Sequence, residues 1–167
     1  MPNIHRTSAF TQRYDGLANV LRSECIVSQA FDPASPERPD TCTVTCVWDT
    51  GATNSVISPR LVEALKLVPT GRMPVNDARG TKISNTYIVN VMLPNNVEIP
   101  FLQVTEGILL GFDMLVGMDI ISKGDFSVSC PEGKTVFSFR LPSAHEVDFV
   151  DGKVLQTPIR TRHLQQR

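Results

Sequence analysis

The sequence predicts an all-β class, mostly β with two short helices, in a barrel-like arrangement. Short stretches of alternating or β-branched residues recur along the chain, and segments rich in proline, glycine and asparagine separate them. Helical patterns occur in only two segments, and both are short. Many short strands with few helices are typical of barrel-like β domains. At 167 residues the chain is long enough for one domain with tails.

Three regions are expected along the chain. Residues 1–16 are polar and unpatterned, and we expect a flexible N-terminal arm there. Residues 17–141 carry the strand and helix patterns and form the predicted domain. The pattern fades after Leu141, so residues 142–167 are expected to be a C-terminal tail, either disordered or docked on a dimer partner.

The first two predicted strands are Val20–Phe31 and Thr41–Trp48, joined as a hairpin by the proline-rich residues 32–40. A short helix should follow, because Ser58 is a favourable N-cap and Pro59 suits the first helical position.

Residues 73–84 come next and are predicted to form a hairpin with a flexible tip. Strands are then expected at Thr86–Leu93 and Val97–Val104. A buried strand around Met114–Val116, a glycine turn and a short helix precede a last hairpin over residues 126–140.

The charges are nearly balanced, with a formal net charge of −1. This gives no electrostatic argument for binding nucleic acid or a membrane surface. No apolar run approaches the length of a membrane span, and the N-terminus lacks the apolar core of a signal peptide. We therefore expect a cytoplasmic protein without nucleic-acid or membrane partners.

The four cysteines, Cys25, Cys42, Cys46 and Cys130, are expected to be buried thiols that act as small hydrophobic residues. A zinc site would need further ligands at suitable spacing, and the three histidines lie near the ends of the chain. The sequence therefore predicts no metal site and no other cofactor.

One acidic residue, Asp49, ends an apolar strand and opens a tight Thr50-Gly51 turn. An unpaired charge is costly near a core, so Asp49 is either a solvent-facing loop acid or a semi-buried acid that chemistry requires. The tripeptide alone is weak evidence. Its context is stronger, because an apolar strand precedes it and a second apolar-glycine segment, residues 115–117, follows farther along the chain.

In this context the sequence resembles the retropepsin-like aspartic proteases, the single-domain, dimeric relatives of pepsin. Three segments carry the resemblance: residues 48–57 around the acid, the hairpin at residues 73–84 in the place of the family's flap, and residues 115–121. The resemblance spans roughly residues 18–139. It implies the acid protease fold, a closed β-barrel with one lobe per chain.

The resemblance also implies an aspartic endopeptidase. In that chemistry two neighbouring carboxylates share one proton; one takes a proton from water while the other hydrogen-bonds the carbonyl. The chain has one Asp-Thr-Gly, and Asp113 and Asp119 lack the Thr-Gly turn. The second carboxylate is therefore expected from Asp49 of another copy, so that a homodimer is obligate for catalysis.

Supporting roles follow from the resemblance. Thr50 should cross the dimer axis and hydrogen-bond the partner's main chain, and Gly51 should offer its backbone to the substrate. Ala52 follows the retropepsin pattern. Val116 and Gly117 should pack behind the active-site loop and carry no chemistry.

The flap tip is expected to consist of Asn76, Asp77, Ala78, Arg79 and Gly80. Gly80 would give hinge freedom, and closure would exclude water from the reaction. A peptide substrate would bind extended between flap and floor, like an added strand. The alternative for this hairpin is an ordinary exposed turn.

Two positions depart from the retroviral pattern, in which an Asp and an Arg form ion pairs at the dimer interface. Thr53 and Met118 stand at these positions. Because both partners are absent together, no charge is stranded. We therefore expect a dimer held more by apolar contacts and terminal strands.

Two other functions stay open. A domain of this fold could bind peptides or proteins without cleaving them, since fold does not guarantee function. Alternatively, Asp49 could be an ordinary loop acid in an unrelated β-barrel binding module. The intact Asp49-Thr50-Gly51 turn argues against a loss of catalysis.

Overall fold

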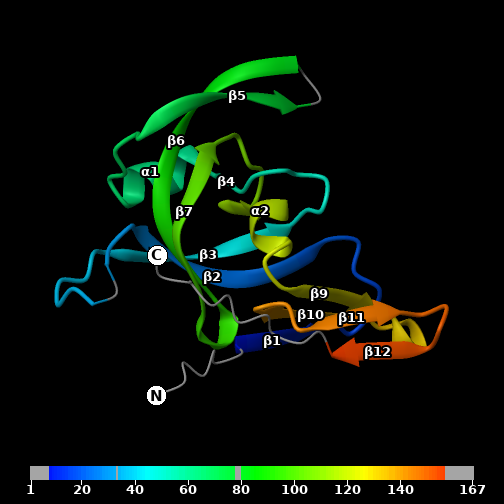
Figure 1. Ribbon diagram of the computed structural model, residues 1–167. Coiled ribbons are helices and arrows are strands. Elements are labelled where there is room, and N and C mark those ends of the chain that lie inside the picture. Colours follow the sequence, from blue (N-terminus) through cyan, green and yellow to red (C-terminus); the bar gives the residue numbers. More distant parts are fainter. Residues whose placement is uncertain (1–7, 33, 78–79, 157–167) are drawn as a thin grey trace, which may run out of the picture.

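Six strands close into a barrel in the computed structural model of the chain, which describes residues 8–32, 34–77 and 80–156. Their order is β2-β3-β8-β4-β7-β6, and β2 also pairs with β6, which closes the barrel; β5 extends the sheet beyond β6. The bounds are β2 (Leu21–Gln29), β3 (Thr41–Trp48), β4 (Val56–Ile57), β5 (Gly71–Asp77), β6 (Gly80–Leu93), β7 (Val97–Glu106) and β8 (Met114–Val116). The all-β prediction and the closed barrel are confirmed (Figure 1).

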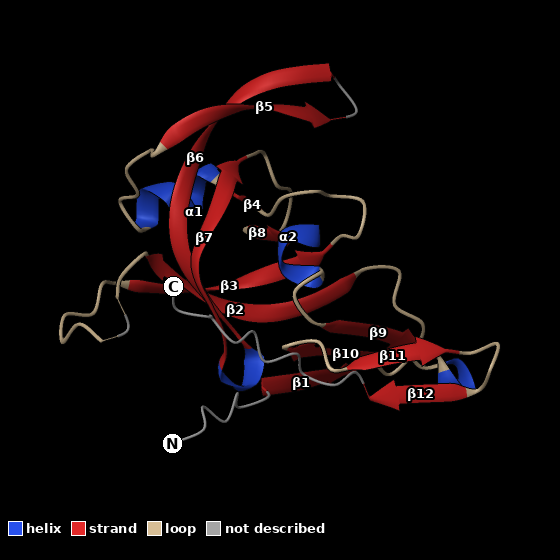
Figure 2. Cartoon of the chain, viewed as in Figure 1, coloured by secondary structure: helices blue, strands red, loops and turns tan. Residues whose placement is uncertain are grey.

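Two smaller sheets lie at the other end of the molecule from the β5–β6 hairpin (Figure 1). One has the order β1-β10-β9 and the other is the β11–β12 hairpin. Their strands are β1 (Ser8–Arg13), β9 (Asp125–Ser129), β10 (Val136–Leu141), β11 (His145–Asp148) and β12 (Lys153–Gln156). Among the described residues, helical structure is limited to short pieces (Figure 2): α1 (Pro59–Ala64), α2 (Met118–Ile121), η1 (Pro94–Asn96) and η2 (Pro131–Gly133). In the described part of the chain, no helix has the length and apolar character needed to cross a membrane.

An aromatic cluster joins the β1-β10-β9 sheet to the barrel. The cluster consists of Phe10, Trp48, Phe126, Phe137 and Phe139. The rings of Trp48 and Phe137 meet edge to face with centroids 4.9 Å apart, a favourable geometry for aromatic pairs. The indole N–H of Trp48 donates to the Ser23 hydroxyl at 3.0 Å. The residue immediately before Asp49 is therefore fixed by packing and by a hydrogen bond.

Several predicted elements are confirmed. Strand β3 has the expected bounds and pairs antiparallel with β2. The Ser58 side chain caps α1 by accepting from the Leu61 N–H, and Pro59 is the first helical residue. The helix is short, as expected. It ends at Ala64, and Lys66 adopts a positive φ of 50° that a continuing helix does not allow.

Three expectations differ from the structure. Ser8–Arg13 was expected in the flexible arm but forms β1, which pairs with β10; only Phe10 is buried in this strand, so its sequence shows no clear period. The separate strand expected at Thr86–Leu93 is the second half of one long strand, β6. Part of the expected tail forms the β11–β12 hairpin.

The cysteine prediction is wrong in part. Cys25 and Cys46 form a disulfide between β2 and β3, with their Cα atoms 6.3 Å apart. They lie diagonally in the antiparallel ladder, because Cys25 is opposite Val44. This pairing depends on the register between two strands, which the cysteine spacing does not give. Cys42 is a half-buried free thiol and Cys130 an exposed one.

Candidate active site

Asp49 lies in the loop that follows β3, and its side chain is half-buried. Its backbone N–H donates to the Val116 carbonyl oxygen at 3.0 Å, which extends the pairing of β3 with β8 by one residue. The Gly51 N–H donates to Asp49 Oδ1 at 2.8 Å. Oδ2 has no hydrogen-bond partner among the described residues. One oxygen is therefore oriented by the turn, and the other is available for chemistry.

The segment after β8 lies directly behind this loop. A Cβ atom on Gly117 would be 2.7 Å from the backbone carbon of Asn54, so no larger residue fits there without a backbone shift. The Met118 N–H donates to the Ala52 carbonyl oxygen at 2.8 Å. The structure thus brings together the two motifs that lie far apart in the sequence.

Asp119 has a supporting role that the sequence analysis missed. Its Oδ1 accepts from the Ser55 hydroxyl at 2.7 Å, and its Oδ2 accepts from the Ser55 N–H at 2.9 Å. Ser55 is fully buried and its hydroxyl oxygen also accepts from the Gly117 N–H at 3.1 Å. Asp119 therefore fixes the end of the Asp49 loop at Ser55 to α2. An acid in the first turn of the helix after the glycine was the signal that could have indicated it.

Asp113 is a second structural acid. It accepts hydrogen bonds from the Arg60 side chain and from the Ser58 hydroxyl, which lies 2.8 Å from Oδ1. The Arg60 guanidinium holds the pKa of Asp113 below its ordinary value, and the Ser58 hydroxyl acts in the same direction. A carboxylate engaged in this way anchors α1.

Thr50 and Gly51 are exposed and Ala52 is half-buried. The two residues at the positions of the retroviral ion pair differ in their surroundings. Thr53 is exposed and its carbonyl oxygen accepts from the Asp119 N–H at 3.2 Å, whereas Met118 is 36% exposed. In the described part of the chain, no group of three or more His, Cys, Asp or Glu side chains could hold a metal ion.

The hairpin predicted as a flap is the β5–β6 hairpin, which projects away from the barrel (Figure 1). Its strands pair up to Asp77 opposite Gly80, and the Thr81 hydroxyl donates to Asn76 Oδ1 at 2.7 Å. Gly80 has a φ of +122°, which favours glycine. Ala78 and Arg79 lie outside the described residues.

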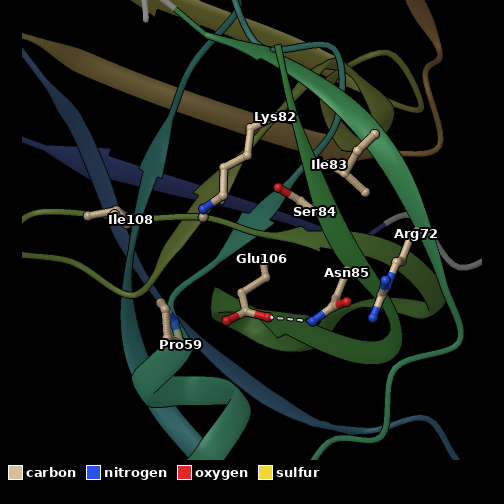
Figure 3. A pocket seen from close by; sticks show the side chains of 9 residues that line it. Pro59, Arg72, Lys82, Ile83, Ser84, Asn85, Glu106 and Ile108 are labelled. Atoms are coloured by element: carbon tan, nitrogen blue, oxygen red, sulfur yellow. Dashed lines mark hydrogen bonds between the residues drawn. The ribbon is translucent and has the colours of Figure 1, made fainter. Parts of the chain in front are cut away.

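A groove runs between this hairpin and the end of β7. It consists of two adjoining cavities of about 470 Å³ and about 360 Å³. Both are lined by Lys82, Ser84, Glu106, Gly107 and Ile108. The smaller cavity is shown in Figure 3. A groove beside a projecting hairpin can accommodate an extended chain segment.

Comparisons with known proteins place this site in a family. Residues 40–123, half of the chain, match the family model described as gag-polyprotein putative aspartyl protease. This range contains Asp49, the β5–β6 hairpin and Gly117. No curated protein matches the sequence.

Solved structures that are similar to the chain include the following three. A retropepsin-like aspartic protease from Rickettsia conorii has 10% identity and a TM-score of 0.49, with 81% of this chain and 96% of that chain covered. The retroviral protease-like domain of Ddi1 from Leishmania major has 19% identity and a TM-score of 0.42, with 66% of this chain and 82% of that chain covered. The foamy viral protease-reverse transcriptase in complex with an RNA/DNA hybrid has 18% identity and a TM-score of 0.42, with 62% of this chain and 12% of that chain covered. On the family match, the chain belongs to the gag-polyprotein putative aspartyl proteases, which are retropepsin-like aspartic proteases.

Proposed function

We propose that the protein is an aspartic endopeptidase that acts as a homodimer, with one Asp49 from each chain. The observation that carries this proposal is the state of Asp49. Its Oδ1 accepts from the Gly51 N–H, its Oδ2 has no partner among the described residues, and the β8–α2 segment holds its loop from behind. A carboxylate that has one oxygen oriented and the other without a partner, in a loop held by neighbouring elements, is better suited to a catalytic role than to a purely structural one.

The rest of the chain supports the need for a second copy. Asp113 is engaged by Arg60 and Ser58, and Asp119 by Ser55. Neither carboxylate is free to pair with Asp49. A two-fold axis between two Asp49 loops would supply the second carboxylate. Because the two copies are identical, its loop would have the same geometry as the first.

The reaction follows from two carboxylates that share one proton. The ionised Asp49 takes a proton from water as the water oxygen attacks the peptide carbonyl carbon, and the protonated Asp49 donates its proton to the carbonyl oxygen. The resulting gem-diol intermediate breaks its C–N bond as the first Asp49 passes the water-derived proton to the leaving nitrogen, and one diol hydroxyl returns a proton to the second Asp49. The products are a carboxylic acid and an amine, and both carboxyl groups return to their starting states.

The β5–β6 hairpin is proposed to cover an extended substrate. Its edge strand, β5, offers backbone groups to a peptide, and the groove beside it is large enough for side chains. Closure would exclude bulk water and retain the one water molecule that attacks the reacting bond.

The test compares the wild type with Asp49→Asn and with Asp15→Asn, which removes the same charge from an exposed loop. Each is incubated with a peptide library at weakly acidic and neutral pH. Cleavage by wild type and Asp15→Asn, with a loss of at least about 100-fold in Asp49→Asn, is expected. Equal cleavage by Asp49→Asn would remove Asp49 from the mechanism. Binding without cleavage by any of the three would establish a binding module instead.

Equilibrium sedimentation tests the dimer. Activity should track the dimer fraction as the protein is diluted. A monomer that retains full activity would overturn the two-fold arrangement.

A further inference from the structure

Glu106 is the acidic residue shared by the two cavities of the groove. It is the last residue of β7, and its backbone is paired in register with Ile57 of β4. Its side chain is half-buried. The position of this carboxylate is therefore set by the barrel and not by a loop.

Two neutral donors orient the Glu106 carboxylate. The Tyr87 hydroxyl donates to Oε2 at 2.8 Å, and the Asn85 side-chain nitrogen donates to the same oxygen at 3.3 Å. Tyr87 is buried; burial raises the pKa of its phenol, and the hydrogen bond to Glu106 raises it further, so the phenol stays protonated and continues to donate. In Figure 3 one Glu106 oxygen faces Asn85 and the other is turned away from it.

The second oxygen, Oε1, has no partner among the described residues. No described Lys or Arg forms an ion pair with Glu106, although Lys82 and Arg72 line the groove. Both of these cations are exposed on the hairpin strands, where solvent and salt weaken their competition for Glu106 without removing it. A half-buried, oriented carboxylate interacts more strongly with an incoming charge than exposed cations do.

The walls of the larger cavity are suited to a long aliphatic stem. Its apolar lining comprises Val56, Val75, Ile108 and Leu110. Lysine and arginine bury such stems along apolar surface while their charged ends reach polar groups. An acidic side chain would instead place a second negative charge beside Glu106.

We infer that Glu106 is a specificity-determining residue, and that the groove accepts a lysine or arginine side chain of the substrate, with its cation on Glu106 Oε1. This inference rests on the proposed peptidase activity. The cation replaces water on Oε1 with a charge-assisted hydrogen bond, while Oε2 keeps its bonds to Tyr87 and Asn85.

The experiment measures cleavage of a peptide library that varies the charge at each position. The wild type should prefer Lys or Arg over the neutral isostere Gln at one position by about tenfold. Glu106→Gln keeps an oxygen for Tyr87 but removes the charge, and should lose the preference. Glu98→Gln, at the other end of β7 and exposed, should keep it. Lys82→Ala removes the competing cation and should increase it.

The outcomes separate this inference from the proposed function. If the wild type cleaves nothing, the peptidase itself is overturned. If the wild type cleaves without preferring a basic side chain, or Glu106→Gln keeps the wild-type profile, only the role of Glu106 is overturned. If thermal unfolding shows that Glu106→Gln is not folded, Lys82→Ala decides, and an unchanged or weaker preference in that variant overturns the inference.

Discussion

The loop that carries Asp49 and the β5–β6 hairpin are held in different ways. The loop is hydrogen-bonded to β8 and α2 through Asp49, Ala52 and Ser55, and the Ser55 side chain is fully buried. In the hairpin, β5 lies at the edge of the sheet, and its described side chains are half-buried or exposed.

This difference separates two requirements of the proposed reaction. Catalytic groups must stay within a fraction of an ångström of their working positions, which requires packing on several sides. A segment that admits and covers a substrate must open at low cost, and such segments have few buried contacts. Changes near the loop should therefore reduce stability and activity together, whereas changes in the hairpin should affect activity alone.

The largest effect on stability should come from the Cys25–Cys46 disulfide, which ties β2 to the strand that leads into the Asp49 loop. Closing a loop of this sequence separation, 21 residues, stabilises a fold by about 3 kcal/mol. We expect reduction to lower the free energy of unfolding by that amount in denaturant titrations. Cys130→Ser is the control, because that thiol is free and exposed.

A thiol count on the denatured, unreduced protein checks the same bond. Two reactive thiols, those of Cys42 and Cys130, are expected. A count of four would show that Cys25 and Cys46 are both reduced and would contradict the disulfide.

Gly117→Ala should cost about 2 kcal/mol, because the added Cβ would meet Asn54 backbone atoms at 2.7 Å. The same clash would displace the Asp49 loop, so peptidase activity should fall with stability. Gly16→Ala is the matched control, since a Cβ there meets nothing within 4 Å. If Gly117→Ala lowered stability but left activity intact, the rigid support would not be needed for catalysis.

Asp125 should make the β1-β10-β9 sheet sensitive to acid. Burial raises its pKa, but hydrogen bonds from Ser143, Arg140 and the Ala144 N–H outweigh burial and lower the pKa to about 2. The unfolded chain binds this proton at the ordinary value of 3.8, so the stabilisation is complete above that pH and is lost as the pH falls towards 2. The loss should amount to about 1–2 kcal/mol. In Asp125→Asn, the free energy of unfolding should not show this fall between pH 3.8 and 2. A pH profile identical to that of the wild type would contradict the role given to Asp125.

Local patterns in the sequence predicted the parts of the molecule that depend on neighbouring residues. Three such features depend on a short stretch of chain, and the structure contains all of them. They are the β3 strand, the Ser58 cap of α1 and the glycine turn at Gly117 before α2. The Asp49 turn was found for the same reason.

The parts that were missed depend on register between distant segments. Strand β1 exists because Phe10 reaches the aromatic cluster when β1 pairs with β10. The disulfide needs the β2–β3 register, and the orientation of Glu106 needs Tyr87 on the neighbouring strand. A single sequence contains the residues but not the pairings.

The smallest effect on stability is expected from Gly80→Ala in the hairpin. The φ of +122° at Gly80 is unfavourable for alanine, at a cost of about 1 kcal/mol. Because Gly80 pairs only with Asp77 across the hairpin, the strain should distort the end of the hairpin and leave the barrel unchanged. Thermal unfolding should therefore stay close to wild type. Hydrogen exchange should accelerate in β5 and the first half of β6 but not in β8, and kcat/KM should fall several-fold. Faster exchange with unchanged kcat/KM would mean that the hairpin does not limit turnover. The difference in rigidity between the Asp49 loop and the β5–β6 hairpin would then have no effect on catalysis.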